Sequence, residues 1–230
     1  MKKKSLKTAA LVLSIVGILG AGGIMAYLTD TDSATNTFNM KKVDITEEET
    51  GWTEPEEVTP NMVITKDPTV ANIGDVPVFV FQTVSVPVAN VVVAKEDGTR
   101  LAQADTELFS FTANPGWYLM GTRNIMGEGA YAANVVAREY LYAYGTNAKM
   151  TALPETAGQN RTPALFNNVK YANVIEGSVD NKGNSLTAGT QVIDVKAYGI
   201  QTTDVNGNIT DPAGIWAVYT NQNGITNVYN

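Results

Sequence analysis

Apolar residues occur in two kinds of segment along the chain. One is a charge-free run from Thr8 to Thr29. The other kind is short and rich in β-branched and aromatic residues, as in VPVFVFQTVSVPVANVVV within residues 61–93, where part of the run alternates apolar and polar side chains. Such a pattern is typical of strands. ANVVAREYLYAY (133–144) is ambiguous between helix and strand, and we favour a strand for REYLYAY because its side chains can pack on pleated faces.

Turn sequences separate these short segments. KEDGTR (95–100), SVDNKGNSL (178–186) and TDVNGNIT (203–210) predict hairpin turns, and residues 72–75 predict a further turn. Pro77 and Pro87 are expected at strand starts, edges or bulges, since proline cannot donate to a central ladder. Short strands between such turns indicate a sandwich or a barrel rather than alternating β/α units.

Two segments predict something other than a buried strand. Asp211 can cap a helix in which Pro212 takes the first position, so a short helix is expected over Ala213 to Tyr219. The acidic, Pro-containing stretch 43–57 predicts a solvated loop. The alternative is a cation site, which no regular ligand spacing supports. We therefore expect an all-β fold: a jelly-roll-like antiparallel β-sandwich with minor helix over residues 43–230.

The N-terminus predicts an export signal of residues 1–26, with a hydrophobic signal helix. A basic MKKKSLK precedes the apolar run, whose second half, GILGAGGIMA, is weakened as a helix by four glycines. Ala26 and Tyr27 then flank the expected signal peptidase cleavage site. The alternative is an uncleaved anchor, which would be the chain's only membrane contact. Both interpretations place the remainder outside the cytoplasm.

The net charge of the chain limits the classes of partner that it is expected to bind. The chain has a formal net charge of −7, and its first 26 residues hold basic side chains but no acid. The remainder is therefore more acidic than the whole. Such a surface repels nucleic acid and anionic lipid, so neither is an expected partner.

A resemblance to a known family begins at the apolar run. GAGGIMAYLTDTDSATNTF, followed by the strand-like MKKVDITEEE, resembles the SipW-dependent signal peptides of Gram-positive bacteria, carried by the TasA and camelysin group of secreted biofilm-matrix proteins. ANIGDVPVFVFQTVSVP resembles a strand element of that group. TPALFNNVKYANVIEG, VIDVKAYGIQTTDV and IWAVYTNQ resemble later strands and the terminal helix of clostridial members.

The resemblance implies a secreted structural subunit of extracellular biofilm-matrix fibres, in the matrix or at the cell surface of a Gram-positive bacterium. Its partners would be further copies of itself, related matrix subunits and, during export, signal peptidase. In this group the freed N-terminal segment adds as a strand to a neighbour. Residues 27–42 would then be an assembly strand and linker, with Tyr27, Leu28, Thr29 and Phe38 as its strand residues, although Asp30 and Asp32 weaken a buried strand.

The sequence offers little support for enzyme activity. Camelysin relatives have been described as metalloproteases, yet the chain contains no histidine and no cysteine, which are the usual zinc ligands. Serine catalysis lacks its histidine partner for the same reason. LPETAG (153–158) lacks the hydrophobic tail that cell-wall sorting needs, and DVNGNITD (204–211) lacks the glycine and glutamate of a calcium loop. We predict no enzyme activity, no cofactor and no metal.

The second hypothesis is a cell-surface module that binds carbohydrate or protein. Its most plausible feature is Trp117 with Tyr118, in NPGWYL, as a candidate ligand platform. Tryptophans in such positions are more often part of a core or half-buried at a sheet edge.

Overall fold

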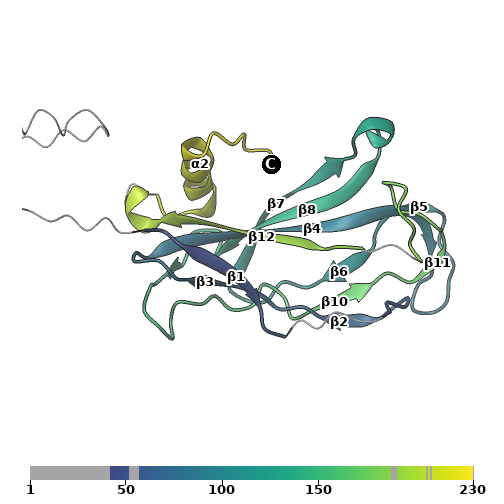
Figure 1. Ribbon diagram of the computed structural model, residues 1–230, viewed down its shortest axis with the longest axis horizontal. Coiled ribbons are helices and arrows are strands. Elements are labelled where there is room, and N and C mark those ends of the chain that lie inside the picture. Colours follow the sequence, from purple (N-terminus) through teal and green to yellow (C-terminus); the bar gives the residue numbers. More distant parts are fainter. Residues whose placement is uncertain (1–41, 52–56, 188–190, 206, 208, 230) are drawn as a thin grey trace, which may run out of the picture. The chain divides into compact units, whose positions relative to one another are not determined.

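A computed structural model describes residues 42–51, 57–187, 191–205, 207 and 209–229. Residues Met40–Asn230 form a unit of their own. The long strand β4 (Val78–Val93) organises this unit, because five other strands pair with it in antiparallel fashion (Figure 1). These strands are β5 (Ala104–Glu107), β8 (Val135–Tyr144), β9 (Ala152–Leu153), β11 (Val174–Glu176) and β12 (Asp194–Gln201).

Further strands extend this sheet and build the layer beside it. The strands of this sheet follow the order β11-β4-β8-β7. β7 (Trp117–Met126) is the last strand in this order and pairs with β8. A three-stranded sheet has the order β2-β10-β6, and β1 pairs with β3 in a two-stranded sheet. The bounds of these strands are Ile45–Glu49 for β1, Val63–Thr65 for β2, Pro68–Asn72 for β3, Phe109–Phe111 for β6 and Asn168–Tyr171 for β10.

The side chains of β4 alternate between two hydrophobic clusters, which explains why the strand is buried on both faces. Val80, Val84 and Val86 belong to the larger cluster, which includes Val169 of β10 and lies between the sheets. Phe81 belongs to the second cluster, which includes Ile215 and Trp216 of the helix α2 (Pro212–Gln222). Figure 1 shows this helix beside the sheet. The result is a sandwich of antiparallel sheets with one α-helix among the described residues, as predicted.

Among the described residues, three short helical elements accompany the sheets: η1 (Gly129–Tyr131), η2 (Thr202–Asp204) and α2 (Pro212–Gln222). Asp211 caps α2 as predicted, since its Oδ1 accepts a hydrogen bond from the Gly214 amide at 2.8 Å. Trp216 of this helix packs edge-to-face on Phe81, with ring centroids 4.9 Å apart. The helix is thereby fixed to the outer face of β4.

Several local predictions are confirmed. REYLYAY lies in β8, and turns form in KEDGTR, where Lys95 N donates to Thr99 O, and in SVDNKGNSL. Pro77 directly precedes β4. Pro87 lies inside it, between the residues that pair with β12 and those that pair with β5, so its missing N–H falls at a change of partner strand.

Two predictions are wrong. The acidic stretch 43–57 is not a loop throughout: Ile45–Glu49 form β1, so the strand-like interpretation of MKKVDITEEE holds for this part. TDVNGNIT does not form a hairpin, because the chain passes from β12 through η2 into α2 and the described residues after it contain no strand. The signal helix predicted for residues 1–26 lies outside the described residues.

Candidate assembly site at the base of the N-terminal segment

Five residues with predicted roles precede the described part of the chain. They are Ala26 and Tyr27 at the expected cleavage site, and Leu28, Thr29 and Phe38 of the expected assembly strand. These assignments stay predictions. The structure describes the point where the N-terminal segment enters the domain, at residues 42–44 followed by β1. We call the contacts around this point the base of the N-terminal segment.

Trp117 and Tyr118 are adjacent on β7 and therefore point to opposite faces of the sheet. The Trp117 indole is 8% exposed, and its Nε1 donates a hydrogen bond to the Pro163 carbonyl oxygen at 3.1 Å. Its ring also packs against Tyr144, with centroids 5.5 Å apart. Tyr118 is exposed. The structure does not bring the two rings onto one surface, and a binding role for Tyr118 stays a prediction.

Two backbone hydrogen bonds fix the entry into β1. The Ile73 amide donates to the Asp44 carbonyl oxygen and the Asp75 amide donates to that of Lys42, each at 2.9 Å. The turn that carries these donors comes very close to the entering chain. A Cβ added at Gly74 would lie 2.4 Å from the Lys42 carbonyl oxygen, so only glycine permits this approach.

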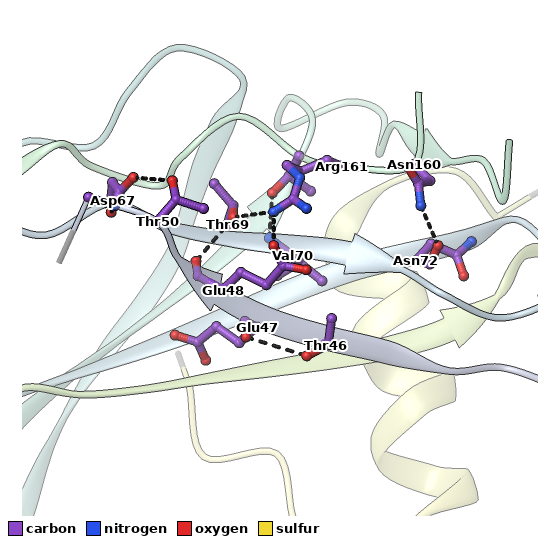
Figure 2. A network of polar contacts seen from close by, with 12 residues as sticks. Thr46, Glu47, Glu48, Thr50, Asp67, Thr69, Val70, Asn72, Asn160 and Arg161 are labelled. Atoms are coloured by element: carbon purple, nitrogen blue, oxygen red, sulfur yellow. Dashed lines mark hydrogen bonds and ion pairs between the residues drawn. The ribbon is translucent and has the colours of Figure 1, made fainter. Parts of the chain in front are cut away.

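The Asn72 side chain holds the same turn from inside the protein, where it is fully buried. Its Oδ1 accepts a hydrogen bond from the Gly74 amide at 3.0 Å, and its Nδ2 donates to the carbonyl oxygens of Val76 and Leu153 at 2.8 and 3.1 Å. Its own carbonyl oxygen accepts from Asn160 Nδ2 at 2.9 Å (Figure 2). The entry point is thus tied to β9 and to the loop that comes after it.

Polar contacts join β1 to the rest of the domain on one face. Ile45–Glu49 pair residue by residue with Pro68–Asn72. Glu48 forms an ion pair with Arg161, whose Nη1 also lies 3.4 Å from Thr69 Oγ1, and this hydroxyl donates to the Glu48 carbonyl oxygen at 3.1 Å (Figure 2). The strand is therefore held by a segment more than a hundred residues away in sequence.

The opposite face of β1 carries Glu47 and Glu49, since side chains alternate along a strand. Glu49 forms an ion pair with Lys66, and these side chains are only 20% and 11% exposed. Burial raises the pKa of Glu47 to about 7, and the charge of Glu49 adds to the shift, while Lys66 opposes it. Two carboxyl groups and one amine are therefore close together in a half-buried setting.

The chemistry that this base offers is backbone pairing. β1 pairs with β3 along one edge, and no described strand pairs with its other edge. β12 passes nearby, where a Cβ at Gly199 would lie 3.2 Å from Ile45 Cδ1. A strand with one unpaired edge presents N–H and C=O groups that a further strand can use.

The described residues contain no group of three or more His, Cys, Asp or Glu side chains that could hold a metal ion. In the same part of the chain, no helix is long and apolar enough to cross a membrane. A shallow groove of about 440 Å³ lies along β2, β10 and β6, and Val63, Phe111, Asn167 and Lys170 contribute to its lining.

The sequence pattern predicts a turn at Asn72 but not the buried hydrogen bonds of its side chain, and it does not indicate the roles of Lys66 and Arg161. The ion pairs of these two residues join positions 17 and 113 apart in sequence. No local sequence pattern predicts contacts between residues so far apart in the chain. The one available signal was an amide side chain within an apolar run, TVANIG, for Asn72.

Comparison with known proteins gives a family match over the first part of the chain. Residues 1–102 match the family model described as camelysin metallo-endopeptidase, a range that includes the N-terminal segment, its base and β4. No curated protein and no solved structure gives a match. The family match confirms the resemblance to TasA/camelysin-type proteins, which are typically extracellular or surface proteins.

Proposed function

We propose that this TasA/camelysin-type protein is a secreted structural subunit of extracellular matrix fibres, and that it assembles by donating its N-terminal segment to another copy. The observation that carries the proposal is the base of the N-terminal segment. There β1 and residues 42–44 are held by a complete strand register and by buried hydrogen bonds. A segment that transmits force between subunits needs such an attachment.

The length of the chain before this base suits the role. Residues 27–41 lie between the expected cleavage site and the described domain. Fully extended, they would span about 50 Å, which is enough to reach along a neighbouring domain. Tyr27, Leu28 and Phe38 supply apolar anchors for such a strand.

The domain also offers edges to which a strand can add. Among the described strands, β7 ends its strand path, and β1 and β12 each pair with a single other strand. An extended peptide gains main-chain hydrogen bonds at an edge of this kind, with its alternate side chains setting the specificity. Addition of one subunit's segment to the next is a head-to-tail contact that does not close, so it yields filaments.

Electron microscopy of two chains tests the proposal. We expect residues 27–230 to form filaments in negative stain and residues 39–230 to remain monomeric at equal concentration and salt. Filaments from both chains would overturn N-terminal donation but keep the structural role. No filaments from either would count against self-assembly itself.

Point variants within residues 27–230 sharpen this test. Leu28→Asp places a charge at an expected anchor, while Ser33→Asp adds the same charge away from the anchors. We expect the first variant to abolish filaments and the second to slow them at most. An excess of a peptide of residues 27–38 should also block growth by occupying the acceptor, whereas a scrambled peptide should not.

A metallo-endopeptidase is the second candidate, favoured by the description of the matching family. A protease would cleave casein in a manner that a chelator abolishes. We expect the purified chain to leave casein intact with or without added zinc. Chelator-sensitive cleavage that co-purifies with the chain would favour the protease instead.

A further inference from the structure

Lys66 and Glu49 place an amine and a carboxyl group in contact at the base of the N-terminal segment. Glu47 lies two residues before Glu49 on the same face of β1 and is half-buried. We infer that Lys66 Nζ and Glu49 Cδ condense into an amide, which joins the end of β1 covalently to the connection between β2 and β3. This would be a self-catalysed modification of the folded chain.

The condensation needs no oxidant and no co-reactant. The Lys66 ammonium first passes one proton to the Glu49 carboxylate that it contacts. The neutral Nζ then attacks Cδ, and a C–N bond forms. Glu47 takes a proton from the nitrogen and returns it to the departing hydroxyl, so that the C–O bond breaks and water leaves. The net change is one ammonium and one carboxylate converted into one amide and one water.

Glu47 is suited to this proton transfer. Burial raises its pKa to about 7, with further contributions from Glu49 and Asp194. A group with a pKa near the working pH both accepts and returns a proton readily. Glu47 therefore begins and ends the reaction in the same protonation state.

The surrounding contacts hold the reacting groups in place. Asp67 accepts hydrogen bonds from the Gly51 amide at 2.8 Å and from Thr50 Oγ1 at 3.0 Å, which fixes the turn after Glu49 to the residue after Lys66 (Figure 2). The Lys66 amide itself donates to the Asn167 carbonyl oxygen at 3.1 Å. Groups held in this way react as if at a very high local concentration.

Such a link would have a mechanical consequence. Pulling on the N-terminal segment loads β1, which otherwise resists through hydrogen bonds, ion pairs and the packing of Val43 and Ile45 on the core. The chain contains no cysteine, so a disulfide cannot reinforce this strand. Only this consequence rests on the proposed function; the amide itself is a property of the isolated chain.

Mass spectrometry of the purified full chain tests the amide. We expect an intact mass one water below the sequence mass, and a branched peptide in which a fragment containing Glu49 is joined to one containing Lys66. Lys66→Arg keeps the positive charge but removes the nucleophile, so its mass should show no water loss. Lys42→Arg is the matched control, because the Lys42 side chain is exposed and pairs with Asp44 rather than with Glu49, and it should lose water as the parent chain does.

The variant Glu47→Gln removes the group that transfers the proton but leaves the contact between Lys66 and Glu49 in place. We expect a linked fraction at least tenfold lower after the same time. Complete linkage in this variant would overturn the role of Glu47. An unlinked parent chain, with its sequence mass and an unmodified Lys66 peptide, would overturn the amide, as would water loss that persists in Lys66→Arg. Because mass is measured on single chains, neither result depends on whether fibres form.

Discussion

At the scale of single residues, Asn72 shows how much one buried amide can hold. Its side chain makes three hydrogen bonds, to the Gly74 amide and to the carbonyl oxygens of Val76 and Leu153. Asn72→Ala would leave these groups buried without partners, so we expect the free energy of unfolding to fall by about 3 kcal/mol. Urea denaturation measures this change. The exposed Asn124→Ala should stay within about 0.5 kcal/mol, and a similar loss in both variants would contradict the argument.

The raised pKa of Glu47 predicts that the free energy of unfolding depends on pH. Its pKa is about 7 in the folded chain against 4.5 for a free carboxyl group. Between these values the folded state binds more protons than the unfolded state, so the free energy of unfolding falls as pH rises from 4.5 to about 7 and then levels off. Because Glu47 is partly exposed, solvent screening limits the loss to about 1–2 kcal/mol.

The test is urea denaturation of the parent chain and Glu47→Gln across this pH range. The variant should lose this part of the slope. The slope is compared rather than the absolute stability, because Glu47→Gln is also expected to lower the linked fraction. The charged groups that act on Glu47 are Glu49, Lys66 and Asp194, but burial is the largest cause of its raised pKa. The sign should therefore persist if Glu49 and Lys66 are joined. Identical slopes in both proteins would contradict the assignment to Glu47.

At the scale of elements, the contact between the turn at Gly74 and the chain entering β1 decides how firmly the strand is attached. Gly74→Ala places a Cβ 2.4 Å from the Lys42 carbonyl oxygen and 2.7 Å from the Asp44 amide nitrogen, both backbone atoms. We expect a loss of about 2 kcal/mol and faster hydrogen exchange at the Ile73 and Asp75 amides, which donate across this contact. Gly207→Ala, where a Cβ meets nothing within 4 Å, is the control.

Elements with local causes could be predicted from the sequence. β4 and β8 are long runs of β-branched and aromatic residues, and α2 begins at an Asp-Pro pair that caps it. β1 could not be assigned with the same certainty, because three consecutive glutamates indicate a solvated segment. Glu48 and Glu49 are accommodated by Arg161 and Lys66, and these partners are fixed by the tertiary fold alone. For the same reason, the contacts at the base of the N-terminal segment could not be predicted from the sequence.

TDVNGNIT (203–210) is the opposite case, because a strong local sequence signal is overridden by the tertiary structure. Its Asn-Gly pair is a strong local signal for a hairpin, yet the residues beyond it enter α2. Ile215 and Trp216 of this helix are buried against Phe81, Leu141 and Ile200. Packing on the sheet therefore determines the structure beyond residue 210, and the described residues there supply no second strand for a hairpin.

At the scale of the whole molecule, charge opposes assembly. Four of the 16 basic residues and none of the 23 acids precede Tyr27, which leaves 12 basic and 23 acidic side chains in residues 27–230. Subunits with a net charge of −11 repel one another, so apolar anchors and strand hydrogen bonds have to outweigh this repulsion in a fibre. Raising the salt from about 0.01 M to about 0.15 M shortens the Debye length from about 30 Å to about 8 Å.

We therefore expect filaments of residues 27–230 to form with a shorter lag, by light scattering, at the higher salt. Screening removes the repulsion but leaves strand pairing and apolar contact intact. Residues 39–230, with nearly the same charge, should not assemble at either salt, which separates screening from non-specific precipitation. Slower assembly at higher salt would mean that opposite charges, such as Asp30 or Asp32 against a lysine of the neighbour, dominate the contact. Strand donation would then depend on ion pairs rather than on its apolar anchors.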